Sequence, residues 1–196
     1  MHSEECLSFL PRYLRRVPGV SQIVSRYQRG PQPAVDFSRA YWTPPLSPAS
    51  ALCLEREQIA QLGLNPLVSL TDHDNIEAGA TLQETAGADE VPLSVEWTVP
   101  YSGSIFHLGI HNLPPGEAKS WMSAMMAYTA SQDERLLRHL LHALAAIPQV
   151  LVVLNHPFWL EEGIEEAVHR PALDRFLRMH LGCLHAFRVE RHPQVA

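Results

Sequence analysis

Strand-length apolar runs alternate with helical stretches along most of this chain, and this alternation limits the fold more than any other feature. Residues 150–154 are a continuous apolar run, typical of a strand that is buried on both faces. The alternation predicts an α/β fold with a mostly parallel sheet or a barrel. The expected strands are residues 34–37, 66–70, 91–97, 104–110, 150–154 and 184–190.

Helices are expected between these strands. The helix at 47–62 has the clearest end signals, because Ser47 can cap its N-terminus, Pro48 suits its first turn and Gly63 ends it. The other expected helices are residues 76–85, 117–130, 133–147, 161–168 and 172–180.

The first 33 residues are expected to form a separate segment, a helical appendage followed by a linker that ends in Gly30-Pro31-Gln32-Pro33. The α/β domain then covers residues 34–196. The N-terminal segment is the basic part of the chain, but its aromatic residues do not alternate with its arginines as in a stacking platform for nucleic acid. Packing on the edge of the domain is therefore favoured over nucleic-acid binding.

Composition excludes several classes of protein. Hydrophobic residues make up 46% of the chain and charged residues 18%, which is enough apolar material for a core. The net charge of −6 argues against binding along a nucleic-acid backbone but allows a small phosphorylated substrate. No segment approaches the roughly 18 apolar residues of a membrane span, and the N-terminus lacks a signal-peptide pattern. Three distant cysteines argue against a disulfide framework, so a cytoplasmic protein is expected.

Histidine and carboxylate residues collect at the ends of the expected strands. His73 and His156 each follow an expected strand closely, and Glu96 lies near the end of another. In a parallel α/β sheet, the carboxyl ends of the strands share one edge, where ligand sites form. His107 lies inside a strand and would reach the same site if that strand runs antiparallel.

This combination of side chains suits a metal ion. Imidazole nitrogens and carboxylate oxygens together favour Zn, Mn or Fe. Asp72 and Asp74 flank His73, and such carboxylates orient a ligating histidine and raise its basicity. A bound metal would bring the pKa of a water nucleophile close to neutral. The alternative for each histidine is an ordinary hydrogen-bonded side chain of the core or surface.

Other features point less clearly to a site. His139 and His142 have a spacing that can chelate metal, but a partly exposed helix face is the favoured interpretation. His111 precedes a proline-containing turn and would either line the site or shape the turn. The sequence has no phosphate-binding P-loop, no dinucleotide glycine pattern and no nucleophile elbow.

Four segments resemble motifs of the polymerase and histidinol phosphatase (PHP) family, in the family's order. They are Leu70-Thr71-Asp72-His73-Asp74, Val95-Glu96-Trp97, Phe106-His107-Leu108-Gly109-Ile110 and Val153-Leu154-Asn155-His156-Pro157. The resemblance implies a distorted (β/α)7 barrel that uses two or three divalent metal ions to hydrolyse phosphoesters. It implies metal ligands at His73, Glu96, His107 and His156, with Asp72 and Asp74 as auxiliary catalytic groups.

The chain also departs from the family pattern. The first motif of the family is Asp-x-His-x-His, whereas Ser38 and Ala40 occupy the two histidine positions here. A late Asp-x-His motif has no counterpart, so the barrel is expected to be incomplete at its C-terminal end; a frameshift near Phe187 is one explanation. Two functions stay open: a metal-dependent hydrolase acting on a phosphoester, or a degenerate domain that binds a ligand or partner without turnover.

Overall fold

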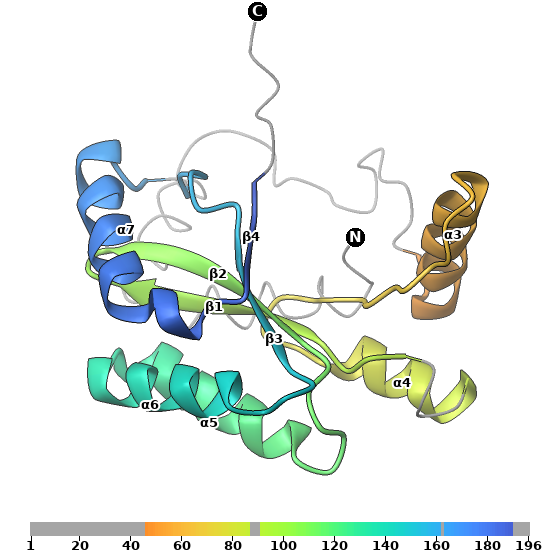
Figure 1. Cartoon of the computed structure of the whole chain (residues 1–196). Helices are drawn as coiled ribbons and strands as arrows, with labels where there is room; N and C mark the ends of the chain where they lie inside the picture. Colours follow the sequence, from red (N-terminus) through yellow and green to blue (C-terminus); the bar gives the residue numbers. More distant parts are fainter. Residues whose placement is uncertain (1–45, 87–90, 162, 190–196) are drawn as a thin grey trace, which may run out of the picture.

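The computed structural model describes residues 46–86, 91–161 and 163–189. Within them the chain forms one four-stranded sheet in the order β1-β2-β3-β4, with helices packed around it (Figure 1). The strands are β1 (Val95–Tyr101), β2 (Ser104–His111), β3 (Leu151–Asn155) and β4 (Ala186–Arg188). The helices are α3 (Pro48–Gln61), α4 (Glu77–Ala86), α5 (Ala118–Ser131), α6 (Glu134–Ala145) and α7 (Glu166–His180), and the 3-10 turn η1 (Leu181–Cys183) follows α7.

The connections between the strands decide their directions. Ser102 and Gly103 join β1 to β2 with φ angles of 50° and 79°, as in the tight turns that suit an antiparallel hairpin. Two helices, α5 and α6, return the chain to the end of the sheet that it left, and β3 is therefore antiparallel to β2. A single helix, α7, crosses between β3 and β4, which are parallel.

The predicted seven-stranded barrel and its mostly parallel sheet are wrong for the described part of the chain. The sheet there is open, with β1 and β4 at its edges, and two of its three strand pairs are antiparallel. A parallel barrel needs one crossover helix between successive strands, whereas here a hairpin and a helix pair each reverse the chain. The expected strand at 34–37 and the N-terminal segment 1–33 lie outside the described residues.

The prediction of a strand at 66–70 is also wrong. These residues are described by the structure and form no strand. Val68 and Leu70 instead join a small apolar cluster with Leu52 of α3 and Leu82 of α4. An apolar run can be buried between helices as well as inside a sheet, and the run alone does not separate the two cases.

The helix that begins after Ser47 follows its sequence signals. The Ser47 hydroxyl accepts a hydrogen bond from the Ser50 N–H at 3.2 Å, and Gly63 follows the helix with a φ of 73°. The prediction of two short helices at 161–168 and 172–180 is wrong, because α7 is one helix with Pro171 inside it. Proline has no N–H, so one carbonyl oxygen of the preceding turn lacks its helical donor. Pro171 is exposed, so water can donate to that oxygen instead.

The two faces of the sheet differ in chemistry. The apolar face packs against α5, α6 and α7, and Figure 1 shows α5 and α6 side by side along it. Its residues are Val95, Trp97, Val99, Tyr101, Phe106, Leu108, Ile110, Val152 and Leu154. The opposite face, called the polar face below, carries Glu96, Thr98, His107, Gly109, His111, Asn155 and Arg188. Among the described residues, no helix is both long and apolar enough to span a membrane.

Candidate metal centre

The segment Asp72–Asn75 brings His73 to the polar face. The Glu96 N–H donates a hydrogen bond to the Asp72 carbonyl at 3.0 Å, and the Asp74 N–H donates to the Glu96 carbonyl at 2.9 Å. His73 lies between these two bonds, in an isolated parallel bridge with Glu96. Asp74 then turns the chain toward α4 with a left-handed φ of 52°. The backbone itself therefore places the His73 ring next to Glu96.

His156 enters the same region from the turn after β3. Its φ is 30°, a conformation that is uncommon for any residue other than glycine. Its N–H donates a hydrogen bond to the Arg188 carbonyl at 2.7 Å, which fixes this backbone position against β4. The His156 Nε2 atom lies 3.1 Å from Glu96 Oε1. The strained turn thus directs the imidazole back over the polar face.

Glu96, His107 and His156 form a compact group of possible ligands. One ligand atom from each lies within 4.8 Å of the other two. His73 lies against the group, with its ring centroid 4.8 Å from that of His107. Imidazole and carboxylate together suit Zn, Mn or Fe, so the residues present fit a divalent cation. Three of the four predicted ligands are brought together and the fourth is adjacent, while metal binding itself stays a prediction.

Glu96 is ionised at neutral pH in spite of its burial. Burial raises the pKa of this carboxyl group, but the hydrogen bond from His156 and the nearby His73 oppose it strongly. The Asn155 side-chain amide also donates to Glu96 Oε1 at 3.1 Å, and the net result is a pKa of about 2. A carboxylate held in its charged form beside imidazoles is a ready cation ligand.

The two predicted auxiliary carboxylates are both buried. Asp74 Oδ1 accepts a hydrogen bond from the Thr98 N–H at 2.8 Å, which ties its segment to β1. Its Oδ2 atom has no hydrogen-bond partner in the structure. Burial raises the pKa of Asp74 to about 6, the hydrogen bonds from Thr98 oppose this, and Glu96 adds to it. Asp72 is 2% exposed, and a catalytic role for either residue stays a prediction.

Sequence reasoning missed Glu161, because it placed this residue in a helix. Glu161 lies in the loop between β3 and α7, and its Oε1 atom is 3.8 Å from His107 Nδ1. Burial raises the pKa of Glu161, His156 opposes this and Glu96 adds to it. Gly163, with a φ of 85°, was the sequence signal for a loop at this position.

The structure places the His111 side chain on the polar face, outside the group of Glu96, His107 and His156. A Cβ atom at Gly109 would lie 2.7 Å from His111 Nε2, so the imidazole extends over Gly109 along the polar face. Its Nδ1 atom is 3.4 Å from the Ser69 hydroxyl, and burial lowers its pKa. His111 therefore lines the polar face on the side of Glu96 away from His107.

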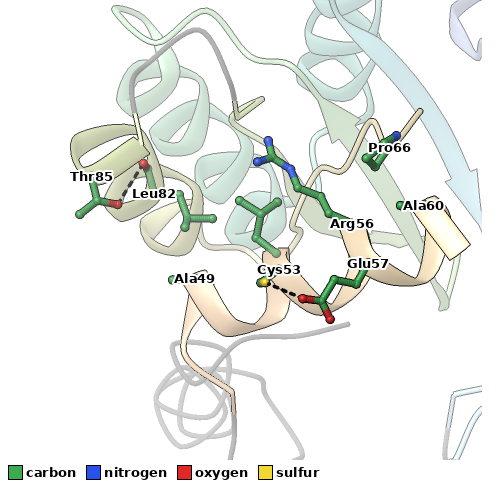
Figure 2. Close-up of a pocket in the computed structure, with 9 residues that line it drawn as sticks. Ala49, Cys53, Arg56, Glu57, Ala60, Pro66, Leu82 and Thr85 are labelled. Atoms are coloured by element: carbon green, nitrogen blue, oxygen red, sulfur yellow. Dashed lines mark hydrogen bonds between the residues drawn. The ribbon is translucent and has the colours of Figure 1, made fainter. Parts of the chain in front are cut away.

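Two other features lie apart from this group. A groove of about 450 Å³ between α3 and α4 contains Cys53, whose thiol donates to Glu57 at 3.4 Å (Figure 2). This hydrogen bond with Glu57 raises the pKa of Cys53, which opposes thiolate chemistry. His139 and His142 are exposed on α6, which confirms the interpretation of an exposed helix face.

In comparisons with known proteins, we found no family model that matches the chain and no similar curated protein. Membership of the PHP family therefore stays a prediction that rests on the four motifs. The chemistry of the site has to be argued from its own geometry.

Proposed function

We propose that this chain binds a divalent metal ion, Zn, Mn or Fe, and uses it to hydrolyse a phosphoester. The observation that carries the proposal is the group of Glu96, His107 and His156, whose ligand atoms lie within 4.8 Å of one another. A divalent cation bound there would act as a Lewis acid toward the ester and lower the pKa of the attacking water. The motif resemblance supports phosphoester hydrolysis as the reaction.

The residues around the ligands prepare the site for a cation. Asn155 orients the Glu96 carboxylate by its hydrogen bond at 3.1 Å, and His156 does the same from the other side. The apolar face behind these strands is closed by helices, so the ligands face away from the hydrophobic core. This arrangement holds the carboxylate and imidazoles in place before a cation arrives, which favours binding.

A small phosphorylated molecule is the substrate that we favour. The net charge of −6 disfavours a nucleic-acid backbone as partner. Arg188 lies on the polar face, opposite Asn155 on β3, and offers a positive charge for a phosphate group. Cys53 and Cys183 are free thiols, which supports a reducing compartment such as the cytoplasm as the place of action.

The test begins with the full chain purified without a chelator. Elemental analysis is expected to find roughly one Zn, Mn or Fe per chain, and the protein is expected to release phosphate from a model ester. A His107→Ala, His156→Ala double variant should lose both the metal and the activity. The matched control is a His139→Ala, His142→Ala double variant, because those histidines are exposed on α6. The proposal would be contradicted if the purified protein contains no metal and added Mn does not produce phosphate release.

A second candidate function is ligand binding without turnover. Ser38 and Ala40 stand where the family's first motif has two histidines, and this substitution favours a degenerate centre. Such a protein would still bind one metal ion through Glu96, His107 and His156. Stoichiometric metal without phosphate release from a panel of phosphomonoesters and phosphodiesters would favour this second function over hydrolysis.

A further inference from the structure

We propose that Glu161, on the loop between β3 and α7, is a fourth protein ligand of the metal centre. The proposal rests on the proposed function, because it requires a cation held by Glu96, His107 and His156. Glu161 does not belong to any of the four motifs, and it reaches the centre from a loop rather than from the sheet.

The distance to His107 already approaches that of two ligands on one ion. Glu161 Oε1 lies 3.8 Å from His107 Nδ1. Metal–ligand bonds of about 2.0–2.2 Å at tetrahedral angles place neighbouring ligand atoms roughly 3.3–3.6 Å apart. The group of Glu96, His107 and His156 extends to 4.8 Å in the same structure, and Glu161 lies outside it, so the Glu161 carboxylate must also move closer to Glu96 and His156. Relative to His107 alone, a movement of a few tenths of an ångström brings the Glu161 oxygen to the spacing of two ligands on one ion.

The loop holds Glu161 in this position through its backbone. The Trp159 N–H donates to the His156 carbonyl at 2.9 Å, and the Ile164 N–H donates to the Glu161 carbonyl at 3.0 Å. The Trp159 ring also lies edge-on to the His156 ring, with centroids 6.2 Å apart. These bonds hold Glu161 beside the ligands, and its side chain is 35% exposed.

The charge of the centre supports the same assignment. Glu96 and Glu161 would contribute two negative charges, and neutral His107 and His156 would contribute none. Two carboxylates at one site repel each other, and a divalent cation between them neutralises both. Glu161 would thus add a protein ligand to a chain that has Ser38 and Ala40 at two positions where the family has histidine.

The experiment uses Co²⁺ as the probe, on the full chain after removal of metal. Calorimetry gives the affinity, and the visible absorption spectrum of Co²⁺ reports the number and type of its ligands. Glu161→Gln and Glu161→Ala are expected to weaken binding by about ten- to a hundredfold and to change the spectrum. Glu165→Gln is the matched control, because Glu165 is exposed at the end of the same loop and makes no side-chain hydrogen bond at the start of α7.

The outcomes separate this proposal from the proposed function. Wild-type affinity and an unchanged spectrum in both Glu161 variants would overturn the role of Glu161 alone. A weaker affinity with an unchanged spectrum would also overturn it, because the carboxylate would then act from outside the coordination sphere. A wild-type chain that binds no Co²⁺ would overturn both proposals. Far-UV circular dichroism checks that each variant is folded.

Discussion

The imidazole of His169, on α7, donates a hydrogen bond from Nε2 to the carbonyl oxygen of Pro157 at 2.8 Å. A carbonyl oxygen can only accept, so Nε2 carries a hydrogen. The Ser104 hydroxyl is hydrogen-bonded to His169 Nδ1, also at 2.8 Å. A buried histidine thus ties the loop that follows His156 to both α7 and the start of β2.

Replacing His169 with alanine should destabilise the protein and loosen the loop. The Ser104 hydroxyl and the Pro157 carbonyl would lose their partner, and a cavity would remain. The expected loss in the free energy of unfolding is about 2–4 kcal/mol, measured by urea denaturation. Metal affinity should also fall, because His156 directly precedes Pro157. His139→Ala is the control, since His139 is exposed, and a His169→Ala variant as stable as this control would contradict the role of His169.

Gly109→Ala is expected to disturb the centre without unfolding the protein. The new Cβ would lie 2.7 Å from His111 Nε2 and 3.4 Å from the Asn155 side-chain amide. The His111 side chain must shift, and the new Cβ comes into contact with Asn155, which orients Glu96, so we expect metal affinity to fall about tenfold. The apolar face is untouched, and the urea midpoint should change little. Gly116→Ala is the control, because nothing lies within 4 Å of a Cβ at that position; equal metal affinity in the two variants would contradict the prediction.

Most helices and strands of the described residues could be predicted because each leaves a local signal, apart from the strand at 66–70 and the two helices expected in place of α7. The sheet topology could not be read from strand signals alone. The direction of β3 depends on the two helices that precede it, and a count of those predicted helices would have indicated an antiparallel β3. The apolar residues at 66–70 looked like a strand, but they are buried between α3 and α4. Burial by helices and burial in a sheet give the same apolar run.

Four site residues could be proposed from motifs. His107 reaches the group from an antiparallel strand, which is the condition set for it, whereas the shared edge of parallel strands expected for the other three was wrong. In the antiparallel sheet, Glu96 lies opposite Gly109 and His107 lies opposite Asn155. This register brings their side chains together, and a shared edge of parallel strands does not. Glu161 could not be predicted, because its position depends on how a loop folds against His107. Contacts between segments that are distant along the chain leave no periodic signal in the amino-acid sequence.

Metal should stabilise the folded chain by mass action. Because a cation would bind the folded centre and not the unfolded chain, Mn²⁺ or Zn²⁺ at a hundred times its Kd is expected to add about 2.7 kcal/mol. Thermal unfolding followed with and without metal measures this as a rise in Tm, and a chelator should reverse it. The His107→Ala, His156→Ala variant should show no rise. An equal rise in that variant would mean that the ion binds elsewhere.

His180 should make the stability of the protein depend on pH in mildly acidic solution. Its side chain is buried against Phe176 and Tyr101, with ring centroids 4.9 Å and 5.9 Å away, and its Nδ1 atom has no hydrogen-bond partner. Burial, reinforced by the positive charge of Arg138, lowers its pKa to about 4 from the ordinary 6.5, although Glu134 opposes this.

The unfolded chain therefore takes up a proton on His180 at a higher pH than the folded chain does. The contribution of neutral His180 to the free energy of unfolding is complete above pH 6.5. This contribution is lost as the pH falls from 6.5 toward 4. Each unit of pKa difference corresponds to about 1.4 kcal/mol. Urea denaturation at several pH values, with His180→Leu compared with wild type, isolates this contribution, because the carboxyl groups titrate in both proteins. The variant should lose less stability than wild type as the pH falls from 6.5 to 4, and parallel curves for the two proteins would show that His180 keeps an ordinary pKa.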